Sequence, residues 1–190
     1  PEALVIFPDN HDMSRIYTQL GEDYGLFQMA VAYVLTTRGV PHFYYGTEVL
    51  MSHPDSNSHG AIRSDFPGGW AGDSKNAYTG AGLSEAEIEA QEFMRTLLKW
   101  RLDKEVLHSG NTTHFRPENS TYVYFRHDDD ESVMVALNKN DSDVSLDLER
   151  FRERLEGYSA ALDVMSGESE SLGEILVLPA RSVRVMELLR

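Results

Sequence analysis

The first 45 residues carry a strand, a helix and a second strand in that order, and this pattern restricts the possible folds more than any other feature. Residues 3–7 are apolar and run into Pro8, which favours a short buried strand. Residues 22–38 predict a helix that is apolar on most sides and closed by Gly39. Residues 40–45 predict a second short strand. Because strand, helix and strand in sequence form a βαβ unit, we expect a parallel α/β arrangement here.

A long polar connection follows this unit. Residues 46–83 are rich in Gly, Ser, Asp, Asn and Pro. Connections of this length are uncommon in compact domains and are usually functional. Ser84 and Glu87 then form the pattern of a capping box, which predicts a helix running to about Asp103.

The hydrophobic period changes from helical to alternating after residue 105. Short alternating segments with polar turns are typical of an antiparallel sandwich, and 128–130 has the composition of a hairpin turn. A small charged helix is expected at 148–155. We therefore predict an α/β portion over 1–104 and an all-β antiparallel sandwich domain over 105–190. Its expected strands are 113–116, 121–126, 132–137, 144–148, 158–164, 172–178 and 182–189.

The charge balance restricts the partners. The chain has 31 acidic and 17 basic residues, a formal net charge of −14. Nucleic acids and anionic membrane surfaces both bind basic proteins, so we expect no nucleic-acid partner and no membrane binding. A neutral substrate fits this balance best. The absence of cysteine excludes disulfides, thiolate catalysis and cysteine-ligated zinc, and leaves the cellular compartment open.

A polar tip follows the first strand and carries groups suited to catalysis. It contains Asn10, His11, Asp12 and Arg15 within six residues. In an α/β barrel, the apolar strands carry their chemistry at their carboxyl ends. The structural alternatives are a turn cap for Asp12 and a packed strand-end imidazole for His11.

Two segments of the α/β portion resemble signatures of the α-amylase family of retaining glycoside hydrolases. Residues 7–12 read Phe-Pro-Asp-Asn-His-Asp, similar to the signature at the end of barrel strand seven. Residues 39–48 resemble the signature at strand eight, Gly-x-Pro-x-x-Tyr-Tyr-Gly-x-Glu. The β-rich tail resembles the family's C-terminal sandwich domain. Within the family the chain looks most like the cyclomaltodextrinase, neopullulanase and periplasmic starch-amylase group.

This resemblance implies a fold and a division of the chain. Residues 1–104 would be the last two strand–helix units of a (β/α)8 TIM barrel, with a long loop at 46–83. Residues 105–190 would be the C-terminal sandwich domain. The chain would then be a piece of a longer protein, and the barrel would be completed by the parent chain or a partner chain.

The resemblance also assigns roles at the first strand end. Retaining glycosidases use a nucleophilic carboxylate and an acid/base carboxyl group around an oxocarbenium-like transition state. Asp12 matches the family's third catalytic carboxylate, which stabilises that state, and His11 matches a histidine that hydrogen-bonds sugar hydroxyls. In the family the nucleophilic Asp follows strand four and the acid/base Glu follows strand five. Neither segment is present in these 190 residues.

Four further residues are candidates for the site. Arg15 suits contact with a neighbouring sugar or structural pairing equally well. Asn10 is expected to order the turn, and Tyr45 to support the site by packing. Trp70, in the long loop, is a candidate to stack on a sugar ring; the alternative is a surface-packed indole.

No metal or cofactor is expected. His53, His59 and Asp55 lie close together in sequence, but their spacing fits no zinc or calcium loop. Glu48 occupies a position that the family resemblance makes structural rather than catalytic.

We therefore expect the C-terminal segment of a retaining α-glucan hydrolase that acts on starch-like oligosaccharides or cyclodextrins and is inactive as this chain alone. One alternative is a non-catalytic carbohydrate-binding or structural fragment. Another, within the family, is an α-1,6-glucosidase or a transglycosylase. The expected ligand is an α-glucan oligosaccharide, and the sequence leaves open whether the parent is periplasmic, secreted or cytoplasmic.

Overall fold

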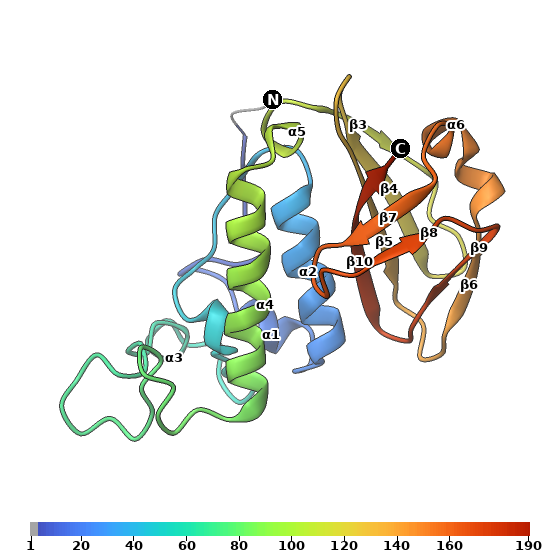
Figure 1. Ribbon diagram of the computed structural model, residues 1–190. Helices are drawn as coiled ribbons and strands as arrows, with labels where there is room; N and C mark the ends of the chain where they lie inside the picture. Colours follow the sequence, from blue (N-terminus) through green and yellow to red (C-terminus); the bar gives the residue numbers. More distant parts are fainter. Residues whose placement is uncertain (1–3) are drawn as a thin grey trace.

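The computed structural model describes residues 4–190, with helices packed on one side of a β domain (Figure 1). Residue 3, the first of the predicted strand 3–7, lies outside the described residues. The first part contains β1 (Val5–Ile6), α1 (Ile16–Gln19), α2 (Tyr24–Thr36), β2 (Val40–Pro41), the 3-10 helix η1 (Thr47–Val49), α3 (His59–Ile62), α4 (Glu85–Leu102) and α5 (Glu105–His108). The second part contains β3 (Asn111–His114), β4 (Thr121–His127), β5 (Ser132–Asn138), β6 (Val144–Asp147), the 3-10 helix η2 (Leu148–Phe151), α6 (Arg152–Leu155), β7 (Ala160–Asp163), β8 (Ser169–Ser171), β9 (Ile175–Leu178) and β10 (Ser182–Leu189).

The predicted βαβ order is present, but its strands are short. β1 pairs in parallel with β2, with Val5 opposite Val40. These two side chains are 51% and 50% exposed, so the prediction that the first strand is buried is wrong for the described residues. The physical reason is that, among residues 4–190, β1 and β2 pair only with each other, so no further strand of this sheet helps to cover Val5 and Val40.

The capping box of α4 forms as predicted. The Ser84 hydroxyl accepts from the Glu87 backbone N–H at 3.3 Å, and Glu87 Oε2 accepts from the Ser84 N–H at 2.7 Å. α4 lies alongside α2, which the Asp23 side chain caps through the Leu26 N–H at 2.9 Å. α2 ends at Thr36, two residues earlier than predicted.

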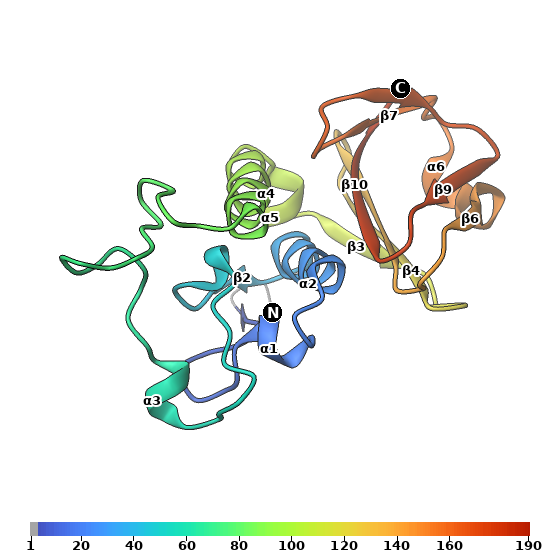
Figure 2. The same ribbon diagram turned by 90° about the horizontal axis from the view of Figure 1, so that it is seen from below.

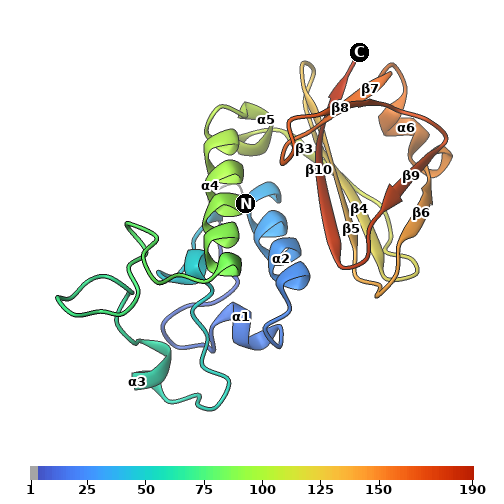
Figure 3. The same ribbon diagram turned by 60° about the horizontal axis from the view of Figure 1, so that its bottom comes forward.

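The β domain consists of two antiparallel sheets. Six strands form one sheet in the order β3-β4-β5-β10-β7-β8, and β6 pairs with β9 in a second, two-stranded sheet. Figures 2 and 3 show the small sheet facing the large one across the domain. The strand predicted at 172–178 is present over residues 175–178 as β9 of the small sheet. Residues 169–171 form β8 of the large sheet, which was not predicted.

The large sheet is a middle layer that is buried on both faces. Alternate residues of β4 and β5 therefore enter two different cores, which explains why most positions of these two strands are buried. The core facing the helices includes Phe27, Val31, Leu35, Phe93, Leu97, Tyr124, Val133, Val135 and Val185. The core facing the small sheet includes Val123, Phe125, Met134, Ala136, Phe151, Leu146, Leu176, Leu178 and Met186.

Two buried arginines bond the last turn of α2, one from the β domain and one from α4. Arg126, on β4, donates from Nη1 to the carbonyls of Thr36 and Leu107 at 3.1 Å each. Its Nη2 reaches the Gly110 carbonyl at 2.8 Å. Arg101, on α4, donates to the Leu35 carbonyl at 2.6 Å. Positive charge at a helix C-terminus is favourable, and these donors satisfy carbonyls that the helix leaves unpaired.

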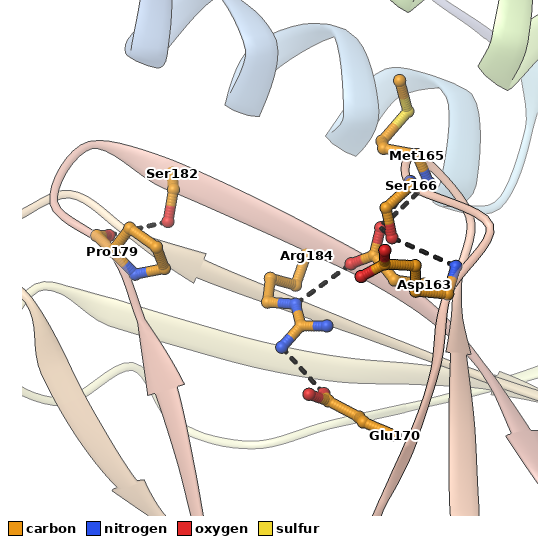
Figure 4. Close-up of polar contacts among 8 residues, drawn as sticks. Asp163, Met165, Ser166, Glu170, Pro179, Ser182 and Arg184 are labelled. Carbon is orange, nitrogen blue, oxygen red and sulfur yellow. Dashed lines mark hydrogen bonds and ion pairs between the residues drawn. The ribbon is translucent and has the colours of Figure 1, made fainter.

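A third arginine ties together the far end of the large sheet. Figure 4 shows Arg184 between two carboxylates, with Nε donating to Asp163 at 3.0 Å and Nη1 contacting Glu170 at 2.8 Å. Asp163 Oδ1 also accepts from the backbone N–H groups of Met165 and Ser166, both at 3.0 Å. These contacts connect β10 to the turn between β7 and β8.

Replacing Arg126 by Met should destabilise the chain strongly. The substitution keeps an apolar stem and removes the donors to buried carbonyls, each of which costs roughly 1–3 kcal/mol when left unpaired. We expect the free energy of unfolding in urea to fall by about 3 kcal/mol or more. Arg116→Met is the matched control, because that side chain is 85% exposed. Equal small effects of the two substitutions would contradict the junction described above.

Candidate functional site

The polar tip after β1 is an ordered turn. The Asn10 side-chain oxygen accepts from the Asp12 N–H at 2.8 Å, and the Asn10 carbonyl accepts from the Met13 N–H at 3.2 Å. An Asn that bonds the backbone two residues on is a common way to fix such a turn. Asn10 thus orders the segment that carries His11 and Asp12.

Asp9 anchors this turn from inside, and the sequence analysis missed it. Its side chain is fully buried, and Oδ2 accepts from the Ile16 N–H at 2.7 Å at the start of α1. Oδ1 has no hydrogen-bond partner among the described residues. Burial raises the pKa of the Asp9 carboxyl above its ordinary value of 3.8, although the Ile16 N–H and the Arg15 charge oppose that shift. The sequence does not reveal that Asp9 is buried, because its burial is set only in the folded chain.

His11 and Asp12 point outward from the turn. Their side chains are 62% and 59% exposed, and His11 Nε2 lies 3.2 Å from Asp12 Oδ2. An exposed carboxylate beside an exposed imidazole can bind a pair of hydroxyl groups, since the carboxylate accepts and a neutral imidazole both donates and accepts.

Arg63 reaches this turn from the long loop, 51 residues further along the chain. Its Nη2 donates to Asp12 Oδ1 at 2.8 Å, and its Nε donates to the His11 carbonyl at 2.9 Å. Nη2 also lies 2.9 Å from His59 Nδ1. Because a guanidinium only donates, His59 must accept at that nitrogen. Arg63 and His59 were not among the predicted site residues, because only the folded loop brings them to the turn.

Arg15 lies apart from this exposed group. Its side chain is 1% exposed, with the guanidinium carbon 4.2 Å from the centre of the Tyr44 ring and 4.8 Å from that of Tyr45. It donates to the Tyr45 carbonyl. This arrangement favours structural pairing over sugar contact for Arg15. The Tyr45 hydroxyl donates to the Ser64 carbonyl at 2.8 Å, which links the segment after β2 to the long loop.

Trp70 does not join the turn. Its side chain is 68% exposed, and its backbone N–H donates to Asp73 within the same loop. Among residues 4–190 no hydrogen bond or ring contact connects Trp70 to residues 10–15. The structure therefore brings together Asn10, His11 and Asp12, packs the exposed Tyr45 ring against the buried Arg15, and keeps Trp70 separate.

The described residues offer neither a metal-binding cluster nor a membrane-spanning helix. Within residues 4–190 there is no group of three or more His, Asp or Glu side chains arranged to bind a metal ion. Over the same residues, no helix combines the length and the apolar character that crossing a bilayer requires.

Comparison with known proteins gives consistent similarities. Residues 112–187 match the family model described as the cyclo-malto-dextrinase C-terminal domain. The chain is 32% identical over 138 residues to a cyclomaltodextrin glucanotransferase of Geobacillus stearothermophilus, covering 73% of this chain and 17% of that protein. The chain therefore spans about a sixth of the length of this relative.

Solved structures show the same fold over nearly the whole chain. The crystal structure of AmyP in complex with maltose has a TM-score of 0.77 at 14% identity, covering 96% of this chain and 40% of that one. The alpha-amylase from Geobacillus thermoleovorans, complexed with acarbose, has a TM-score of 0.67 at 22% identity, covering 100% of this chain and 40% of that one.

Asp9→Asn should change how stability depends on pH. The folded state binds the Asp9 proton more tightly than the unfolded state does. The contribution of Asp9 to the free energy of unfolding therefore falls as the pH rises from 3.8 through the folded pKa. Asn keeps an acceptor for the Ile16 N–H and does not titrate. We expect the stability of the native chain minus that of the Asn variant to fall as the pH rises, measured by urea unfolding. A difference that rises with pH would mean that Arg15 outweighs burial.

Proposed function

Because the chain belongs to the α-amylase family of glycoside hydrolases, we propose that it is the C-terminal segment of a retaining α-glucan hydrolase that acts on starch-like oligosaccharides or cyclodextrins. In this proposal the chain contributes the transition-state-stabilising Asp12 and the substrate-binding His11. The observation that carries it is the ordered turn at the end of β1, which presents both side chains to solvent 3.2 Å apart.

The chemistry of the turn suits that role. Glycoside cleavage passes through an oxocarbenium-like state, so a carboxylate near the ring stabilises the developing positive charge. Asp12 supplies such a carboxylate and can also accept from sugar hydroxyls. His11 donates from one ring nitrogen and accepts at the other. Arg63 positions Asp12 through the 2.8 Å contact and holds the turn through the His11 carbonyl.

We propose that β1, α2, β2 and α4 are the last strand–helix units of a (β/α)8 barrel. Three features support this: the parallel β1–β2 pair, the unpaired outer edges of both strands, and the fold likeness that extends across the whole chain. The carboxyl ends of barrel strands meet at one face, where barrel active sites lie. In this proposal the nucleophile and the acid/base residue belong to the other part of the longer protein, which corresponds to the part of the relatives that this chain does not match.

Asp12→Asn in the longer protein should reduce kcat for maltooligosaccharide hydrolysis on the order of 10²–10³-fold, the range for losing one preorganised electrostatic contact. The substitution preserves size and removes charge. Asp55→Asn, an exposed carboxylate of the long loop, is the matched control and should leave kcat unchanged. Full activity of the Asp12→Asn enzyme would contradict the proposed role.

The 190-residue chain by itself should release no reducing sugar from maltooligosaccharides, since it would lack both reacting carboxyl groups.

The 190-residue chain should also associate with itself, because the unpaired edges of β1 and β2 and the exposed side chains of Leu4 and Val40 favour further strand pairing. Sedimentation velocity and a reducing-sugar assay check both expectations. Turnover above that of an Asp12→Asn chain would refute the first, and a single stable monomer would refute the second.

A further inference from the structure

We propose that the loop over residues 66–83 is a second glucan contact, outside the turn that carries His11 and Asp12, in which the exposed rings of Trp70 and Tyr78 stack on glucose units of a long chain. This proposal rests on the proposed function, because it assumes that the substrate is an α-glucan. It adds a preference for long glucan chains that residues 10–12 alone cannot supply.

The loop is ordered by its own hydrogen bonds. Asp73 Oδ2 accepts from the N–H groups of Gly68 and Trp70, at 2.9 and 3.1 Å. Asn76 Oδ1 accepts from the N–H of Tyr78 at 3.0 Å. The Ala77 N–H donates to the Pro67 carbonyl at 3.0 Å, which joins the two sides of the loop. The backbone under both rings is therefore fixed before any ligand binds.

The loop is also attached to α4. Lys75 Nζ lies 2.6 Å from Glu87 Oε1, and Gln91 Nε2 donates to the Ala77 carbonyl at 3.0 Å. Glu87 is the same residue that closes the capping box of α4. The loop thus takes its position from the start of the longest helix, and binding there costs little ordering entropy.

Both large aromatic rings face water. Trp70 is 68% exposed and Tyr78 is 77% exposed, and the Phe66 ring packs edge-on against Tyr78 with centroids 5.5 Å apart. A single exposed aromatic side chain is ordinary on a protein surface. Two on one short, internally bonded loop provide preformed flat apolar surface, which is the property that a pyranose ring requires of a stacking partner.

The chemistry around the rings suits a neutral, hydroxyl-rich ligand. The same loop has a hollow of about 250 Å³, which is lined by Phe66, the ring that packs on Tyr78, and by Asp65, Pro67, Asp73, Ser74 and Lys75. These side chains combine apolar surface with carboxylate, hydroxyl and ammonium groups that can bond hydroxyls. The chain as a whole carries a net charge of −14, which disfavours an anionic ligand.

The proposed contact is separate from the residues 10–12 turn. Among residues 4–190 no hydrogen bond, ion pair or ring contact joins residues 66–83 to residues 10–15. Figure 3 shows this loop projecting away from both α1 and α3. A short oligosaccharide held at the turn would leave the loop unoccupied, whereas a long chain can contact both.

Steady-state kinetics of the longer protein on maltotriose and on amylose test the proposal. Trp70→Ala and Tyr78→Ala should each raise KM for amylose by about tenfold, the scale on which flat rings stacked on aromatic side chains contribute. kcat on both substrates and KM for maltotriose should not change. Tyr78→Phe and Trp70→Phe keep a flat ring and should retain most of the native KM. Leu102→Ala is the control for an exposed apolar side chain elsewhere, 74% exposed on α4.

The outcomes separate this proposal from the proposed function. Suppose that KM for amylose is unchanged in loop variants that unfold at the native temperature, while Asp12→Asn still lowers kcat as predicted above. That result overturns the loop contact and leaves the proposed function intact. A loss of kcat on maltotriose in the Trp70→Ala enzyme also overturns it, because the ring would then belong to the catalytic cleft. Full turnover by the Asp12→Asn enzyme rejects the proposed function instead.

Discussion

Two buried guanidinium groups hold the end of α2, and the rest of the structure depends on that junction. Arg126 comes from the β domain and Arg101 from α4, and both donate to carbonyls in the last turn of α2. Burial lowers the pKa of both groups, so the carbonyl contacts and the helix dipole must compensate for the lost hydration. α2 is in turn the crossover between β1 and β2, so the β domain fixes the helix that positions both strands.

The candidate site is supported in a similar way, by buried polar groups beneath exposed ones. Asp9 and Arg15 are enclosed and bond the backbone, whereas His11 and Asp12 remain open to solvent. Such a division suits the role proposed for Asp12, because a carboxylate that stabilises charge on a substrate must be accessible and yet held in one geometry. The long loop contributes Arg63 to this geometry and separately carries the ring pair proposed to contact glucan.

Local sequence signals predicted the elements that depend on local interactions. The capping box of Ser84 and Glu87 and the length of α4 both arise from neighbours in sequence. The exposure of β1 could not be predicted, because it depends on which strands lie beside it. The separation of β8 from β9 could not be predicted for the same reason, because residues 169–171 pair in the large sheet and residues 175–178 pair in the small one. Arg63 and Asp9 were missed at the site, because pairing across 51 residues and burial of one carboxylate out of two leave no local pattern.

In the proposed function, Asp12 and His11 bind one sugar ring. A crystal structure of the longer protein with a slowly hydrolysed maltooligosaccharide measures this directly. We predict that the Asp12 carboxylate and the His11 imidazole both lie within about 3.2 Å of hydroxyls of the same ring. The contrary result is an ordered oligosaccharide in the active site, with both side chains bonded only to protein groups such as Arg63.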